Sequence, residues 1–107
     1  MQYQKRIAPA AHKDIAKIFQ YIAKDKPNAA VKIARQIYAS FDLLQENPNI
    51  GVSMNKRLGI KTDYLFWVVA PYIVFYKLEE DNVGVYRVLD GRSDYLATLR
   101  LKGKSIK

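Results

Sequence analysis

The sequence contains no cysteine and only one histidine among its 107 residues. Without cysteine, neither disulfide bonds nor thiolate metal sites can form, and one imidazole cannot build a structural zinc site. The apolar stretch from Leu65 to Ile73 is too short to span a bilayer, and Pro71 interrupts it. The first eleven residues do not have the pattern of a signal peptide. We therefore expect no metal, no cofactor, no membrane contact and a cytoplasmic location.

Acidic residues are also few, with 10 Asp and Glu against 18 Lys and Arg and a net charge of +8. This balance favours polyanionic partners, such as nucleic acid, a nucleoprotein or an acidic protein segment, without choosing among them. The length predicts a single domain, residues 1–99, followed by a basic tail, residues 100–107. The cations of this tail are Arg100, Lys102, Lys104 and Lys107.

Two amphipathic helices are predicted in the first half of the chain. Pro9 suits the first turn of a helix, and apolar residues then recur at helical spacing as far as Ile22. Pro27 starts a second helix of the same kind, which ends at Asn47 because a proline follows. The short link predicts an αα-hairpin, whose apolar stripes need a sheet to pack on. The residues expected on the solvent face of the first helix are Lys13, Asp14, Lys17 and Lys24.

The second half of the chain is typical of strands. Three runs are rich in β-branched and aromatic residues: Thr62 to Val69, Tyr72 to Glu79 and Val83 to Leu89. Links as short as theirs make neighbouring strands antiparallel. With a first strand in Met1 to Ile7, the order is β-α-α-β-β-β, and we predict an α+β fold with the hairpin on a small antiparallel sheet. Gly51 to Lys61 is interpreted as a loop that leads into a strand.

Both faces of the predicted sheet are apolar, because side chains alternate between the faces of a strand. One face carries Leu65, Trp67 and Val69, and the other carries Tyr64, Phe66 and Val68. The hairpin covers one face, and the other keeps exposed apolar surface that suits a protein partner. Tyr86 or Arg87 lies on this second face, depending on the register of the last strand.

Three motifs occur in the order and at the separations found in a known group of toxins. They are Tyr21-Ile22-Ala23-Lys24-Asp25-Lys26-Pro27-Asn28-Ala29-Ala30, Tyr72-Ile73-Val74-Phe75-Tyr76-Lys77 and Val85-Tyr86-Arg87-Val88-Leu89-Asp90-Gly91-Arg92-Ser93-Asp94. Each is weak alone, but together they extend over about Tyr3 to Tyr95, and the chain resembles the ParE/RelE superfamily, nearer to its ParE branch. One departure is Asp90, at a position that is commonly histidine in the family.

The resemblance implies the toxin of a type II toxin–antitoxin pair, neutralised by a cognate antitoxin whose C-terminal segment wraps it. Operator DNA would be reached only through the antitoxin. ParE-branch toxins poison DNA gyrase, whereas RelE-branch toxins cut messenger RNA in the ribosome. Our leading prediction is a ParE-like toxin without chemistry of its own that traps gyrase in its DNA-cleaved state. The alternatives are a ribosome-dependent mRNA endoribonuclease and an inactive member that only binds the antitoxin.

The candidate target-binding residues are Arg57, Arg87, Arg92, Asp94 and Tyr95. Guanidinium groups clamp phosphates or carboxylates with bidentate geometry, so Arg87 and Arg92 would form a basic patch. Arg57 joins this patch if its loop folds back over the sheet. In the other interpretation, Arg87 pairs with Asp90 or Asp94 and only fixes the end of the strand.

Cleavage of RNA needs a base, a proton donor and cations around the reacting phosphate. In the endoribonuclease alternative, Arg87 and Arg92 supply the cations and Tyr95 is the late tyrosine of that branch. A base is missing from this set, because His12 lies on the first helix and the pKa of Asp90 should fall beside two arginines. The sequence therefore favours a toxin that is not an enzyme.

Overall fold

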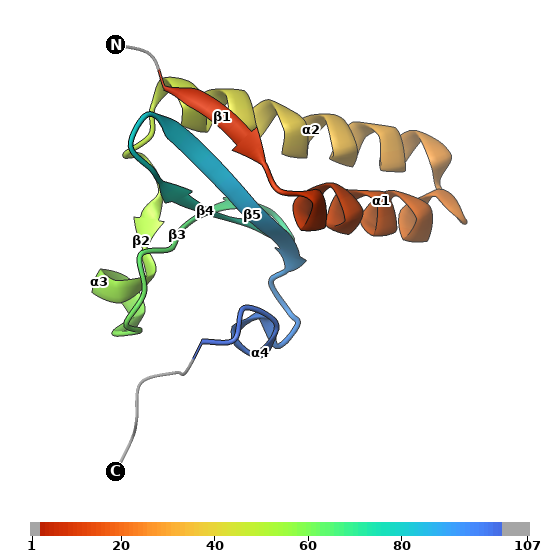
Figure 1. Ribbon diagram of the computed structural model, residues 1–107. Helices are drawn as coiled ribbons and strands as arrows, with labels where there is room; N and C mark the ends of the chain where they lie inside the picture. Colours follow the sequence, from red (N-terminus) through yellow and green to blue (C-terminus); the bar gives the residue numbers. More distant parts are fainter. Residues whose placement is uncertain (1–2, 102–107) are drawn as a thin grey trace.

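The structure is a computed structural model that describes residues 3–101 of the chain. Its elements are β1 (Gln4–Ile7), α1 (Pro9–Ala23), α2 (Pro27–Glu46), β2 (Val52–Ser53), α3 (Met54–Leu58), β3 (Leu65–Val69), β4 (Tyr72–Leu78), β5 (Asn82–Asp90) and α4 (Tyr95–Thr98). The two long helices lie together against the sheet, and the short helices α3 and α4 lie apart from them (Figure 1). In the predicted basic tail, Lys102, Lys104 and Lys107 lie outside the described residues, whereas Leu101 packs against core residues. The domain boundary at residue 99 stays a prediction.

Both long helices begin where the sequence predicts. Pro9 and Pro27 lie in the first turns of α1 and α2, where a missing N–H leaves no helical hydrogen bond unmade. Asn47 ends α2, also as predicted. The prediction for Asp14 is wrong, because this residue is only 8% exposed and faces the sheet rather than solvent.

The five strands form one sheet in the order β1-β5-β4-β3-β2. The strands β3, β4 and β5 are antiparallel neighbours, as their short links predict. β1 pairs with β5 in parallel, with Ile7 opposite Val85, so the sheet is mixed rather than wholly antiparallel. The rule for short links does not govern β1, because the whole helix hairpin separates it from the other strands. The α+β class and the succession of the main elements are confirmed.

The segment interpreted as a loop, residues 51–61, contains β2 and the single-turn helix α3. The hydroxyl of Ser53 accepts a hydrogen bond of 3.1 Å from the Lys56 amide and so caps α3 at its start. Gly59 ends the helix in the left-handed region, with φ of 68°. These two capping residues were the available signals, but so short a helix has no apolar periodicity that could have revealed it.

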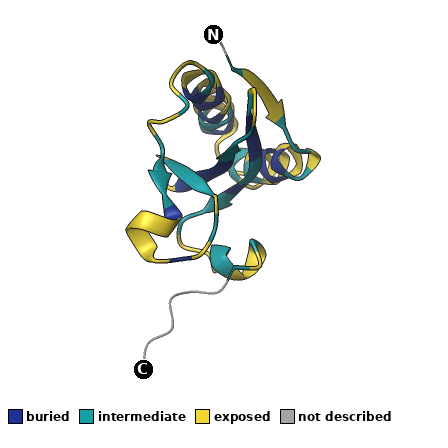
Figure 2. Ribbon diagram, turned by 60° about the vertical axis from the view of Figure 1, so that its left-hand side comes forward, coloured by how far each residue is buried: buried dark blue, intermediate teal, exposed yellow. Residues whose placement is uncertain are grey.

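The hairpin and one face of the sheet enclose the main core. Its buried members are Ala11, Ile15, Ile37, Phe41, Leu44, Tyr72, Val74, Tyr76, Val83, Val85 and Val88. Leu65, Trp67 and Val69 of β3 pack against this cluster, as the alternation predicts. Figure 2 shows the buried residues on the surfaces where the helices and the sheet meet.

The other face of the sheet carries a smaller cluster of its own. Met54, Ile60 and Phe75 are buried there, and Phe66 and Tyr64 pack against them. Residues of α4 and the segment after it complete the cluster: Tyr95, Leu96, Leu99 and Leu101. The face predicted to be open is therefore partly covered, and its large exposed apolar side chain is Val68 at the β3 edge, which is 54% exposed.

A β-bulge in β5 resolves the register that the sequence left open. Phe75 pairs with Arg87 and Tyr76 pairs with Val85, so Tyr86 is an extra residue without a partner in β4. Because the bulge interrupts the alternation, Tyr86 and Arg87 are not forced onto opposite faces. Tyr86 contacts Tyr64 of the second face, and Arg87 lies opposite Phe75 of that face.

Candidate functional site

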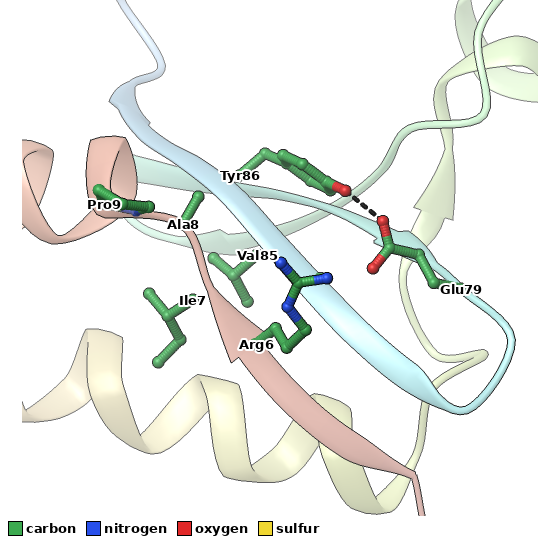
Figure 3. Close-up of a pocket in the computed structure, with 8 residues that line it drawn as sticks. Arg6, Ile7, Ala8, Pro9, Glu79, Val85 and Tyr86 are labelled. Carbon is green, nitrogen blue, oxygen red and sulfur yellow. Dashed lines mark hydrogen bonds between the residues drawn. The ribbon is translucent and has the colours of Figure 1, made fainter.

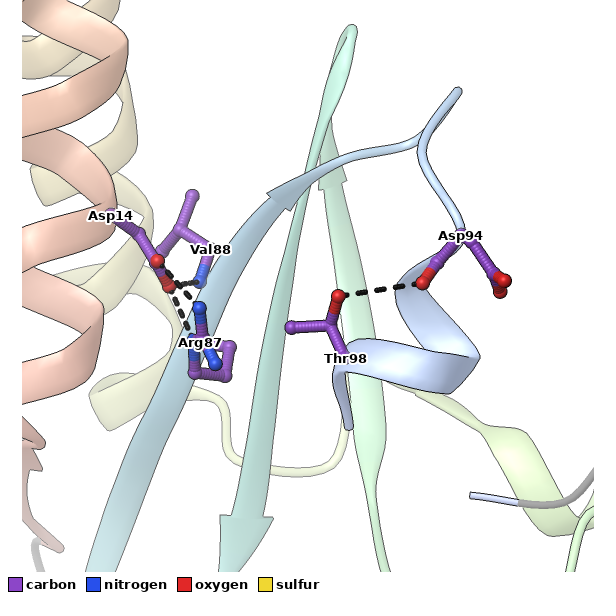
Figure 4. A network of polar contacts seen from close by, with 5 residues as sticks. All are labelled: Asp14, Arg87, Val88, Asp94 and Thr98. Carbon is purple, nitrogen blue, oxygen red and sulfur yellow. Dashed lines mark hydrogen bonds and ion pairs between the residues drawn. The ribbon is translucent and has the colours of Figure 1, made fainter. Parts of the chain in front are cut away.

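Arg87 is held by Asp14 of α1, and not by Asp90 or Asp94. Its Nε and Nη2 donate to the two carboxylate oxygens of Asp14 at 2.7 and 2.8 Å (Figure 4). The backbone N–H of Val88 donates to the same carboxylate at 2.9 Å. Parallel pairing with β1 ends at Val85, and no other strand among residues 3–101 covers this edge of β5 beyond it. Asp14 therefore supplies the acceptor that the Val88 amide would otherwise lack.

This contact sets the electrostatics of Arg87. The hydrogen bonds that Arg87 donates to Asp14 raise the pKa of Arg87 above its usual range, although partial burial acts in the opposite sense. The two donors that point at Asp14 are no longer available for a bidentate grip on a phosphate or a carboxylate of a partner. The arrangement therefore makes Arg87 a clamp between α1 and β5.

Arg92 is paired as well, but it stays exposed. Its Nε and Nη2 donate to the two oxygens of Asp90 at 2.9 and 2.7 Å, and its backbone N–H donates to Asp90 at 2.8 Å. The hydrogen bonds from Arg92 lower the pKa of Asp90 from 3.8 to about 2, in the direction expected from the sequence. A carboxylate with so low a pKa is a poor general base. The side chain of Arg92 is 76% exposed, so its remaining N–H groups face solvent.

Asp94 and Tyr95 lie at the start of α4. A carboxylate oxygen of Asp94 accepts from the Ala97 amide at 3.3 Å, and its carbonyl accepts from the Thr98 hydroxyl at 3.4 Å (Figure 4). The ring of Tyr95 packs on Phe75, with 5.4 Å between the centroids. Asp94 thus caps the start of α4, and Tyr95 docks this helix onto the second face of the sheet.

Arg57 is an exposed residue of α3, whose first residue, Met54, is buried in the cluster of the second face. The residues predicted for the site are therefore distributed over three places. Arg57, Asp94 and Tyr95 belong to the helices over the second face, Arg87 joins α1 to β5, and Arg92 lies in the turn after β5.

Arg92 borders an open pocket of about 320 Å³ between α1 and the ends of β4 and β5, which we call the Tyr21 pocket. Its lining residues are Lys17, Ile18, Tyr21, Tyr72, Asp90 and Arg92. Tyr21 is 76% exposed, whereas Tyr72 is buried, and burial together with nearby Asp90 raises the pKa of the Tyr72 phenol. Neither Arg57 nor Arg87 takes part in this pocket.

A cluster that the sequence did not single out lies on the second face, around Lys77. The Lys77 ammonium lies 4.6 Å from the ring centroid of Tyr64 and 5.4 Å from that of Tyr86. The hydroxyl of Tyr86 donates to Glu79, beside a small pocket of about 120 Å³ that Arg6 also lines (Figure 3). The aromatic runs were visible in the sequence, but the bulge that brings Tyr86 to this cluster was not.

Gly84 makes room for this cluster. A Cβ atom at position 84 would lie 2.7 Å from the Glu79 carboxylate and 3.1 Å from the Tyr86 ring. A glycine inside a strand commonly marks such a close approach or a bulge, and here both occur within three residues.

The outer edge of β3 carries exposed apolar surface, since Val68 there is 54% exposed. β2 pairs with β3 only at Leu65 and Phe66, so the edge beyond Phe66 has no strand partner within the described part of the chain. Two pockets that share Trp67 and Val68 flank this edge, one of about 420 Å³ toward α2 and one of about 190 Å³. An unpaired edge between two pockets suits an extended segment with alternating side chains.

Within residues 3–101, no three His, Cys, Asp or Glu side chains are grouped so that they could hold a metal ion. Among the helices that the structure describes, none combines the length and the apolar character needed to cross a membrane.

Comparisons with known proteins agree with the fold. A sequence model of the family described as "ParE toxin of type II toxin-antitoxin system, parDE" matches residues 6–95. The structure is similar to a chain of the chromosomal ParDE system from P. aeruginosa, with a TM-score of 0.70, 14% identity, and coverage of 83% of this chain and 96% of that one. It is also similar to a chain of the RelBE2 toxin–antitoxin complex from Mycobacterium tuberculosis, with a TM-score of 0.55, 19% identity, and coverage of 84% and 99%. No curated protein matches the sequence.

Proposed function

The chain belongs to the ParE toxin family of type II toxin–antitoxin systems, and we propose that it inhibits DNA gyrase by binding the enzyme in its DNA-cleaved state. The observation that carries this proposal is the match to the ParE family over residues 6–95. The toxin has no chemistry of its own in this account, and its place of action is the cytoplasm. The likeness to a RelBE2 chain concerns the fold, which toxins with different targets can share.

The contacts of the arginines support this choice over RNA cleavage. Arg87 donates to the buried carboxylate of Asp14, so one of the two cations of the endoribonuclease alternative is engaged within the fold. Arg92 donates to Asp90 but keeps further N–H groups exposed. The structure also supplies no base at these residues, because Asp90 has a pKa of about 2. His12 lies on the hairpin, where its Nδ1 is 2.8 Å from the Tyr38 hydroxyl.

The antitoxin, in this proposal, binds at the edge of β3. An extended segment there would pair its backbone with β3 and place alternate side chains in the two pockets that flank Trp67 and Val68. Leu43 of α2 lines the larger pocket and is an exposed apolar residue. Covering this surface removes apolar area from water, which stabilises the complex. Contact with operator DNA passes through the antitoxin.

The test is a plasmid assay with purified gyrase. We expect the toxin to block supercoiling and to leave linear DNA when the reaction is stopped with detergent and protease, because trapped gyrase holds a cleaved duplex. A parallel translation reaction with intact ribosomes should proceed with its messenger RNA uncut. Cut messenger RNA with unaffected gyrase would establish the endoribonuclease alternative, and no effect in either reaction would establish an inactive member.

A further inference from the structure

We propose that the Tyr21 pocket is the contact through which the toxin holds its protein target, and that it receives an apolar side chain next to a carboxylate. The inference rests on the proposed function, since the target in question is gyrase. It assigns target binding to residues of α1 that the sequence did not predict, Lys17 and Tyr21, together with Arg92, which it did.

The aromatic part of the pocket is exposed in the free protein. Tyr21 is 76% exposed at the end of α1, and Ile18 is half-buried one helical turn before it. Exposed tyrosines beside a concavity are typical of residues that dominate binding energy once a partner excludes water from them. At about 320 Å³, the pocket lies at the lower end of the roughly 300–1,000 Å³ of ligand pockets. That volume admits single side chains of a protein surface.

The charges of the pocket indicate what accompanies the apolar group. Within residues 3–101, no carboxylate forms an ion pair with Lys17. Arg92 uses its Nε and Nη2 on Asp90 and keeps further N–H groups for an outside acceptor. A carboxylate of the partner can therefore reach an unpaired ammonium and the free side of a guanidinium.

The same charges favour a protein over a nucleic-acid backbone. A phosphate backbone binds best to several unpaired cations, each of which neutralises one phosphate. Here Lys17 is the only unpaired cation among the lining residues, and the ionised carboxylate of Asp90 belongs to the wall. An isolated carboxylate beside apolar groups fits this mixture of charges, whereas a run of phosphates does not.

One wall of the pocket, the turn that carries Arg92, is held by hydrogen bonds within the fold. The amide of Gly91 donates to the Pro71 carbonyl at 2.8 Å, and the Ser93 hydroxyl donates to the Asp90 carbonyl at 2.6 Å. Together with the three hydrogen bonds from Arg92 to Asp90, these contacts hold the turn that carries the guanidinium. A preorganised side chain loses less conformational entropy on binding, so such a contact contributes more affinity.

The experiment compares toxin variants in the gyrase cleavage assay. Lys17→Glu and Tyr21→Ala should each raise the toxin concentration needed for half-maximal cleavage by about tenfold, as expected for dominant interface residues. Lys32→Glu on α2 makes the same change in net charge at an exposed position outside the pocket, and Phe19→Ala removes an exposed ring of α1 that does not line it. Both controls should match the original toxin, and thermal unfolding should show all four variants folded.

The possible results test the assignment of the pocket separately from the proposed inhibition of gyrase. If the original toxin inhibits gyrase and the Lys17 and Tyr21 variants behave like their controls, the pocket is not the target contact and the gyrase proposal stands. If the original toxin itself leaves gyrase unaffected, the proposed function fails and the target assignment fails with it. If the two variants inhibit gyrase normally but escape a co-expressed antitoxin, the pocket belongs to the antitoxin and the target assignment is wrong.

Discussion

Two carboxylates determine what the candidate arginines are able to contact. Asp14 lies buried against β5 and uses both of its oxygens on the Arg87 guanidinium and the Val88 amide. Asp90 is more exposed and holds Arg92 in the turn after the same strand. The first pair joins two elements of the fold, whereas the second orients a cation toward solvent. This difference in burial is why we assign a structural role to Arg87 and a binding role to Arg92.

Replacing Asp14 with Ala should lower the free energy of unfolding by about 3 kcal/mol, as for other buried ion pairs that lose one partner. The loss arises because the Arg87 guanidinium and the Val88 amide both lose their acceptor. Urea unfolding followed by circular dichroism measures it. Lys13→Ala, on the exposed side of the same helix turn, should change stability by less than about 0.5 kcal/mol. Equal stabilities for the two variants would show that the contact between Asp14 and Arg87 contributes nothing to the free energy of unfolding.

The pairing of Asp90 with Arg92 predicts a specific pH dependence. The pKa of Asp90 is about 2 in the folded chain, below its ordinary 3.8, so the ionised form stabilises the fold above that ordinary value. This contribution is lost as the pH falls from about 4 through about 2, when the carboxylate takes up its proton. Titration of the Asp90 carboxyl carbon by NMR should give a midpoint near 2, and Arg92→Gln should raise it toward 3.8. A midpoint that does not move in Arg92→Gln would rule out Arg92 as the cause.

The sequence selected the candidate arginines but not the carboxylate that pairs with Arg87. Arg87 and Arg92 were selected from the closing block, but Asp14 is 73 positions from Arg87, and nothing local connects the two. A signal for its burial did exist, because Asp14 is three residues after Ala11 and so lies close to the apolar stripe of its helix. A carboxylate at such a position needs a partner to be buried.

Among the helices and strands, the features that the sequence predicted depend on local signals. The features that it did not predict depend on contacts between distant parts of the chain. Pro9 and Pro27 mark the helix starts, and short links make β3, β4 and β5 antiparallel. The parallel position of β1 depends on how the whole hairpin packs, and the bulge at Tyr86 depends on a mismatch between two strands. Neither leaves a periodic pattern in the sequence, so neither was predictable from it.

The loop between α2 and β2 depends on one buried tyrosine. The hydroxyl of Tyr76 donates to the Pro48 carbonyl at 3.0 Å and accepts from the Gly51 amide at 2.9 Å. Tyr76→Phe should therefore cost about 1–3 kcal/mol, because it leaves two backbone groups without a partner. Gly51→Ala should cost more, since its Cβ would overlap the Tyr76 hydroxyl. Thermal unfolding measures whether Gly51→Ala loses more stability than Tyr76→Phe. A Gly51→Ala variant as stable as the original protein would contradict this prediction.

The edge of β3 carries the prediction for the antitoxin. Val68→Arg should abolish neutralisation by a co-expressed antitoxin, because a charged side chain at the edge would have to be desolvated in the complex. Inhibition of gyrase should be unchanged, since Val68 does not line the Tyr21 pocket. Val31→Arg, at an exposed apolar position of α2 outside both β3 pockets, serves as the control for growth rescue. If the antitoxin restores growth as well with the Val68→Arg toxin as with the Val31→Arg control, the antitoxin does not bind at the edge of β3.

For the whole molecule, family and target are separate conclusions. The succession of helices and strands and the match over residues 6–95 establish the ParE family. The net charge of +8 is compatible with gyrase bound to DNA and with the ribosome alike, so it does not distinguish the targets. In this account gyrase is favoured by two contacts: Asp14 engages Arg87, and the low pKa of Asp90 makes this carboxylate a poor base for RNA cleavage.

The most direct measurement is to induce the toxin in growing bacteria and to follow a DNA-damage reporter and amino-acid incorporation in the same culture. Trapped gyrase leaves broken DNA while ribosomes keep working. The account therefore predicts early induction of the reporter with translation still intact. An immediate arrest of translation without induction of the reporter would contradict it and would identify the ribosome as the target.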